Sequence, residues 1–185
     1  MRFPEHTTES SENSNAAYGF SLIELLVVVA IILIIAAIAI PNLMRARIAA
    51  NEAAAVETVR TITSASVIYD ATYGNGYPPD LATLGGLGGL ASCDQGLLID
   101  NIIASPPNQK SGYIFAYAGL GAPDPKAPGC SKPGFEQYLV TAQPAVINQT
   151  GLRSFCADRP AVIHFDVSGL PPGSVAACDA LPTVQ

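Results

Sequence analysis

The chain has 185 residues, 49% of them hydrophobic, and its 15 acidic against 9 basic side chains give a formal charge of −6 at neutral pH. This length excludes a second large core beside the first. The acidic balance argues against nucleic acid as a partner, because phosphate binding needs clustered Lys and Arg side chains, and here the basic residues are thinly spread.

The first strong element along the chain is an apolar run from Phe20 to Ile40, in which only Ser21 and Glu24 are not apolar. As a helix this run is roughly 30 Å long, which is enough to cross a bilayer core. An ionised Glu inside it costs about 2.5 kcal/mol or more, so the pattern predicts that Glu24 has a functional partner. The alternative is a carboxylate near the helix end that reaches the lipid headgroups.

The string GFSLIELL at residues 19–26 precedes the rest of the apolar run, then Ala39-Ile40-Pro41-Asn42 and a stretch of small residues. Over residues 19–50 the chain resembles the type IV pilins and the pseudopilins of type II secretion. The resemblance implies that a prepilin peptidase cuts after Gly19 and methylates the new terminal Phe20. It also implies that Glu24 pairs with the terminal amine of a neighbouring subunit.

From this resemblance we expect the structural subunit of a homo-oligomeric helical filament that is handled by the peptidase and by an inner-membrane assembly platform. The precursor would lie in the bacterial inner membrane, and the product would be a periplasm-spanning or extracellular filament for adhesion or twitching motility. Two alternatives stay open: a pseudopilin that serves protein secretion, and a membrane-anchored binding module that does not polymerise. The leader departs from the usual basic pattern, because it has one Arg against three Glu residues.

The expected organisation is a leader at residues 1–19, a transmembrane and assembly helix at 20–41, and a pilin-like globular domain at 42–185. Residues 42–73 are the amphipathic half of the helix. Pro41 removes one helical hydrogen bond, which predicts a kink or local melting near residues 37–42. The face on which the domain packs is predicted by a stripe at helical spacing: Ile48, Ala55, Val59, Ile62, Ser66 and Tyr69.

Beyond the helix, the sequence predicts an α+β fold with a small antiparallel sheet of three or four strands laid over the helix. Gly74-Asn75-Gly76 ends the helix, and Asp80 caps a short turn to Leu84. A second short helix is expected at residues 97–104. The expected strands are residues 112–117, 135–142 and 161–166, with a possible one at 152–156, and a Pro- and Gly-rich loop spans residues 123–134.

Four cysteines, Cys93, Cys130, Cys156 and Cys178, lie in the part expected to be exported. An even count in an oxidising compartment indicates two disulfides, for which three connectivities exist. We favour Cys93 with Cys130 and Cys156 with Cys178, because each pair closes a short loop around one strand region. Free buried thiols and a metal site are the alternatives, and metal is the weaker one because no Cys-x-x-Cys pair is present.

The sequence predicts no enzyme and no cofactor. The expected mature chain has a single histidine, His164, in the middle of an apolar strand, where a solvated or core-edge role is favoured over catalysis. The acids Asp158, Asp166 and Asp179 near the carboxyl end could gather around a cation. Their spacing follows no calcium loop, so no metal is predicted.

Overall fold

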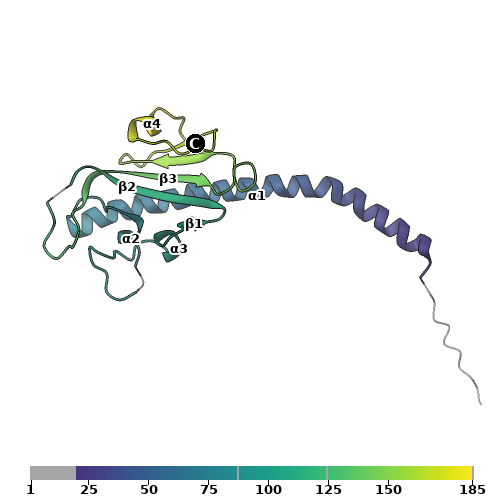
Figure 1. The fold of residues 1–185 in the computed structure, drawn as a ribbon, viewed down its shortest axis with the longest axis horizontal. Helices are drawn as coiled ribbons and strands as arrows, with labels where there is room; N and C mark the ends of the chain where they lie inside the picture. Colours follow the sequence, from purple (N-terminus) through teal and green to yellow (C-terminus); the bar gives the residue numbers. More distant parts are fainter. Residues whose placement is uncertain (1–19, 87, 124, 185) are drawn as a thin grey trace, which may run out of the picture. The chain divides into compact units, whose positions relative to one another are not determined.

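The computed structural model describes residues 20–86, 88–123 and 125–184 (Figure 1). Contacts divide the chain into two compact units, with the boundary between Pro41 and Asn42. One long helix, α1 (Leu22–Tyr73), contributes its first part to the amino-terminal unit and the rest to the carboxyl-terminal unit.

Within the carboxyl-terminal unit, α1 is the central element of the core. Ala55, Val59, Ile62 and Tyr69 are fully buried against the sheet, and Ser66, also buried, donates its hydroxyl to the carbonyl of Ile62. Ile48, also part of the predicted stripe, is half-buried. The apolar stripe therefore gives the packing face that its spacing predicts.

Helix α1 continues without interruption through Pro41. The local melting expected near residues 37–42 is therefore wrong. Pro41 removes only one donor from the ladder, and the residues on either side keep helical geometry. The bend that Pro41 was expected to introduce remains a prediction.

Turn residues end α1 and start the next helix as the sequence predicts. Gly74 takes a positive φ of 57°, and its N–H donates to the carbonyl of Asp70 at 2.8 Å, which ends α1. Asp80 then caps α2 (Leu81–Leu84) by accepting a hydrogen bond from the N–H of Thr83 at 2.8 Å.

The sheet has five antiparallel strands in the order β1-β2-β3-β4-β5, so each strand pairs with its neighbour in sequence. The α+β class is confirmed, but the expected count of three or four strands is wrong by one, because β1 has only two residues and carries no recognisable pattern. Strand β2 also extends past the expected end at residue 117, through an irregularity between Leu120 and Pro123. The strand bounds are β1 Gln109–Lys110, β2 Tyr113–Pro123, β3 Phe135–Pro144, β4 Ser154–Ala157 and β5 Ile163–Asp166.

Different elements pack on the two faces of the sheet. Tyr138 and Val140 of β3 belong to the main core with α1, whereas Leu139 between them packs on the opposite face with Cys156 and Cys178. Cys178 lies in α4 (Val175–Asp179), a short helix that the sequence did not predict (Figure 1). Because successive side chains of a strand point to opposite faces of the sheet, one face packs on α1 and the other forms a second, smaller core.

The helix expected at residues 97–104 is only half present. Leu97 has a positive φ of 53°, and the amides of Leu97 and Leu98 donate to the carbonyls of Gly85 and Leu84. Helix α3 (Asn101–Ala104) begins only after Asp100, whose side chain accepts from the N–H of Ile102. Backbone pairing with the segment after α2 therefore replaces the first helical turn.

Candidate functional site

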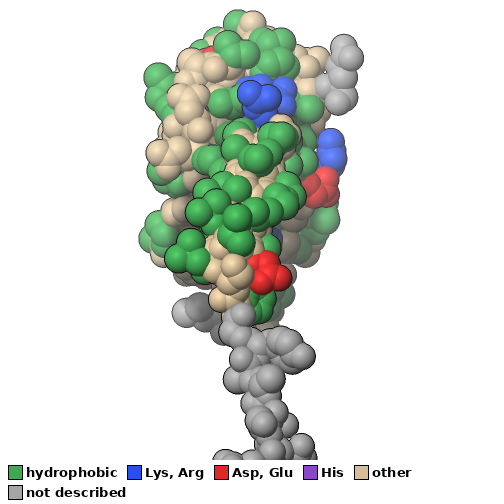
Figure 2. All heavy atoms as spheres, turned by 90° about the vertical axis from the view of Figure 1, so that its right-hand side faces the viewer, with side chains coloured by type: hydrophobic (Ala, Val, Ile, Leu, Met, Phe, Trp, Pro, Cys, Tyr) green, Lys and Arg blue, Asp and Glu red, His purple; other side chains and the backbone are tan. Residues whose placement is uncertain are grey.

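The first part of α1 is an exposed apolar surface. Among the described residues, α1 is the one helix that is long and apolar enough to cross a membrane. None of the residues in its most apolar stretch is buried. Large side chains such as Leu22, Ile31 and Ile38 are 79%, 53% and 67% exposed. In Figure 2, which looks from the side where α1 begins, many hydrophobic side chains and few charged ones are in view. Such a surface requires lipid or protein cover.

Glu24 lies in the first turn of α1 and is exposed. Its Oε2 accepts a long hydrogen bond of 3.4 Å from the N–H of Ser21. Ser21 directly precedes the helix, so Ser21 and Glu24 have the spacing of a capping box, in which the acid at the third helical position reaches back to the cap residue. This capping role was not predicted, although the Ser-x-x-Glu signal of residues 21–24 is visible in the sequence.

The geometry leaves Glu24 available for a second partner. Among the described residues its side chain has one hydrogen bond, from the backbone N–H of Ser21, and one such bond satisfies only part of an ionised carboxylate. Phe20, the first described residue, is 83% exposed. Gly19 and the leader lie outside the described residues, so the structure does not address the expected cleavage site.

Residues 14–40 match the family model described as the prokaryotic N-terminal methylation motif. The chain carries the type IV pilin and pseudopilin signature. This signature implies processing by a prepilin peptidase and assembly at the membrane, and it agrees with inner-membrane insertion of the apolar helix. No curated protein and no solved structure matches the chain.

In the globular unit, an ion pair joins the segment before β4 to α1. Glu52 is 7% exposed, and its Oε2 accepts from Nε and Nη2 of Arg153 at 2.9 and 2.7 Å. Its Oε1 accepts from the backbone N–H groups of Leu152 and Arg153 at 3.0 and 3.1 Å. Burial by itself raises the pKa of Glu52, but these four bonds together hold that pKa below its usual value.

Aromatic rings complete the surroundings of Arg153. The guanidinium carbon lies 5.7 Å from the ring centre of Phe155 and 5.1 Å from that of Phe165. Both distances fall within the range of cation–π attraction. Glu52 of α1, Arg153 just before β4, and one ring each from β4 and β5 thus lie together in the globular unit. The sequence did not predict this cluster, because Glu52 and Arg153 are 101 residues apart.

The cysteines form two disulfides in the structure, Cys93–Cys130 and Cys156–Cys178. These are the pairs that loop length favoured. The first joins the segment after α2 to the long loop before β3, beside Tyr69, whose hydroxyl donates to the carbonyl of Cys93 at 2.6 Å. The second joins β4 to α4.

The other candidate polar residues lie in or next to strands β4 and β5 and helix α4. His164 is 8% exposed in β5, and its Nδ1 lies 2.7 Å from the carbonyl oxygen of Leu181. Asp158 and Asp179 lie together, whereas Asp166 accepts from the N–H of Ser168 in a turn after β5. Across the part of the chain that the structure describes, no group of three or more His, Cys, Asp or Glu side chains is arranged to hold a metal.

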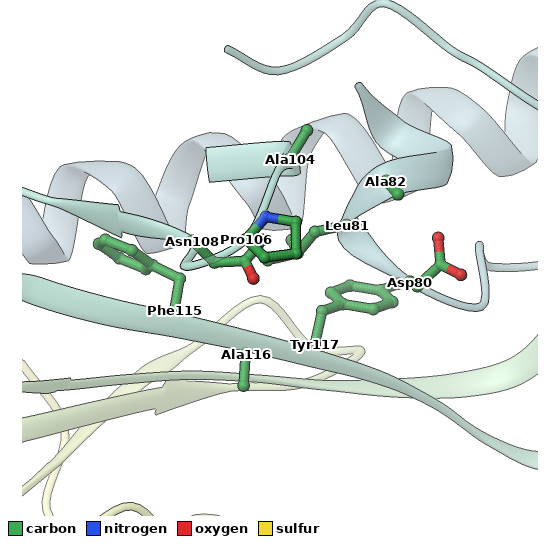
Figure 3. Close-up of a pocket in the computed structure, with 9 residues that line it drawn as sticks. All are labelled: Asp80, Leu81, Ala82, Ala104, Pro106, Asn108, Phe115, Ala116 and Tyr117. Carbon is green, nitrogen blue, oxygen red and sulfur yellow. The ribbon is translucent and has the colours of Figure 1, made fainter. Parts of the chain in front are cut away.

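A cavity of about 350 Å³ opens beside β2, where Pro106 is drawn between the side chains of Phe115 and Tyr117 (Figure 3). Its carboxylate, Asp80, is already occupied by the α2 cap and by Nζ of Lys132 at 3.0 Å. The lining residues are Asp80, Leu81, Ala82, Ala104, Pro106, Asn108, Phe115, Ala116 and Tyr117. This set contains no paired nucleophile and base.

Proposed function

We propose that the protein is a structural subunit of a type IV pilus-like filament. The subunit is inserted in the inner membrane as a precursor, cut after Gly19, methylated at Phe20 and assembled through the apolar part of α1. Adhesion or twitching motility would be properties of the filament. The observation that carries the proposal is a carboxylate, Glu24, at the start of an exposed apolar helix that carries the methylation signature.

The chemistry of the pair supports an assembly role. Cleavage would expose an α-amine with an ordinary pKa near 8, and methylation keeps that amine protonatable. Between packed helices, the amine of Phe20 from one subunit and the carboxylate of Glu24 from another would form an ion pair in a low dielectric. Such a pair sets the register between subunits more than it adds stability, since each charge loses its water.

The weak capping contact would allow Glu24 to exchange the N–H of Ser21 for the amine of a neighbouring subunit. In the single subunit, Oε2 has one long bond to the N–H of Ser21, and an incoming amine would offer a shorter, charge-assisted bond. The four cysteines and the long segment after the sheet favour a pilus subunit over a pseudopilin, which is the second candidate for the same signature.

The experiment is the substitution Glu24→Ala in cells that express the protein with its native assembly proteins. The globular unit does not contain this residue, so the subunit should stay folded and membrane-inserted. Filament yield should fall at least about tenfold, because an unpaired buried charge costs about 3–5 kcal/mol. The measurement is sheared filament against subunit in the membrane fraction.

Glu57→Ala is the matched control. Glu57 is an exposed carboxylate on the same helix. Among the described residues its salt bridge is with Arg60, three residues on, so its loss should leave filament yield unchanged. Normal filament yield with Glu24→Ala would refute the assembly role, and the anchored binding module would then become the better reading.

A further inference from the structure

A buried acid without a hydrogen-bond partner lies at the end of β4. Asp158 is only 4% exposed, and its Oδ1 has no partner among the described residues. A carboxylate in this situation is strongly disfavoured, because it has lost water and gained no donor in exchange. Burial therefore favours the protonated form of Asp158 over the ionised form.

A candidate partner is a second acid, Asp179 of α4. Asp158 and Asp179 line the same cavity, which has a volume of about 500 Å³. The Cys156–Cys178 disulfide brings them together, because Asp158 is two residues beyond the first cysteine and Asp179 directly follows the second. Asp179 is exposed, so it keeps water when it is ionised, whereas Asp158 does not.

The surrounding groups only partly offset the charge of the two acids. The charge of His164 lowers the pKa of Asp158, and Arg159 lines the same cavity. Tyr138 of β3 lines the cavity, and its hydroxyl is buried without a partner among the described residues. His164 of β5 lies opposite Cys156 in the sheet, where Nδ1 is directed to the carbonyl of Leu181. Arg159 is exposed and forms no salt bridge with either acid in the described structure.

We propose that Asp158 and Asp179 form a proton-binding carboxyl pair, in which Asp158 holds the proton and donates a hydrogen bond to Asp179, and that loss of this proton loosens α4 from the sheet. Two carboxyl groups that line one cavity repel each other when both are ionised, so the less hydrated one takes the proton. The inference concerns the globular unit alone and does not depend on filament assembly.

The direction of the pH effect follows from the folded state. Burial first, and then the charge of Asp179, raise the pKa of Asp158 above its usual value. The stabilising contribution of protonated Asp158 is therefore fully present below the ordinary pKa of an aspartic acid, near 3.9. It is lost as pH rises through the pKa that Asp158 has in the folded chain. Loosening should stay local, because the disulfide holds Cys178 and the segment after α4 pairs with β5 at Thr183 and Val184.

The test is a carbon-13 NMR titration of the aspartate carboxyls in the full chain in detergent micelles, together with amide hydrogen-exchange protection factors for residues 175–179. We expect the Asp158 midpoint to lie above about 3.9. The protection factors of α4 should fall over the same pH range. Asp179→Asn should move the Asp158 midpoint downward, and Asp158→Asn should make the protection of α4 independent of pH.

Glu136→Gln removes an exposed carboxylate of the same sheet and should leave the Asp158 midpoint unchanged. An Asp158 midpoint at or below about 3.9 would overturn the proposal. So would a shift of the Asp158 signal on addition of calcium chloride alone, since the pair would then be a cation site. If Asp158→Asn fails to fold, Asp179→Asn still tests the pair, because it should lower the titration midpoint of Asp158.

Discussion

At the scale of single residues, the contact between Glu52 and Arg153 concentrates many interactions in one place. The carboxylate accepts four hydrogen bonds, two of them from backbone amides, while the Arg side chain remains 41% exposed. The backbone bonds distinguish this pair from an ordinary surface salt bridge, which contributes about 0–1 kcal/mol. Glu52 therefore positions the start of β4 as well as balancing a charge.

The substitution Glu52→Gln should lower the free energy of unfolding by about 1–3 kcal/mol, because hydrogen bonds to a charged group are lost and solvent screens part of the effect. Denaturant unfolding of the detergent-solubilised chain measures it. Glu57→Gln, which breaks the exposed pair with Arg60, should change stability by no more than about 0.5 kcal/mol. Equal effects of the two variants would contradict the proposed positioning role.

The same carboxylate also predicts a pH dependence. The pKa of Glu52 is lower in the folded chain than in the unfolded one, so its stabilising contribution is present above an ordinary Glu pKa of about 4.3 and is lost as pH falls through the folded pKa. The loss of stability on acidification should be smaller in Glu52→Gln than in the unsubstituted chain. This direction is opposite to that of Asp158.

At the scale of elements, the amphipathic half of α1 supplies the rigid face on which the sheet forms. Ile62 is fully buried in the main core, whereas Ile68, six residues later on the same helix, is 50% exposed. Helix periodicity explains the difference, because the two positions lie on different faces.

Ile62→Ala should therefore lower the free energy of unfolding by about 2–5 kcal/mol, through lost burial and the cavity left behind. Ile68→Ala should change it by about 0.5 kcal/mol or less. Denaturant unfolding of both variants in the same detergent provides the comparison. Similar losses for both positions would mean that the sheet does not pack on α1 as described.

At the scale of the whole molecule, processing and covalent closure can be checked on native protein. Mass spectrometry should find a chain that begins at methylated Phe20, because the methylation signature spans the junction between Gly19 and Phe20. An assembled protein that still begins at Met1 would contradict the expected cut. The acidic leader makes this a test of the peptidase's tolerance as well.

Disulfide mapping tests the second whole-molecule feature. Peptides from the unreduced protein should join Cys93 to Cys130 and Cys156 to Cys178, which are 37 and 22 residues apart. Replacing Cys156 and Cys178 by Ala together should cost about 2–5 kcal/mol, because the unfolded chain gains freedom when the loop is opened. Four free thiols would remove the prediction, and crossed pairs would contradict only the connectivity.

Elements with local signals could be predicted from the residues alone. An uninterrupted apolar run specified the membrane-length helix, a stripe at helical spacing specified its buried face, and Asp80 and Gly74 specified a helix start and a helix end. Each of these depends on neighbours within a few residues, so pattern and propensity are sufficient to predict it.

Features that join distant segments depend on the three-dimensional fold. Glu52 meets Arg153 across about a hundred residues, and a disulfide brings Asp179 beside Asp158. The start of the helix expected at residue 97 was lost to backbone pairing with the segment after α2, and the two-residue strand β1 exists only because β2 lies beside it. Long-range pairing and burial set these outcomes, and neither leaves a periodic signal in the chain.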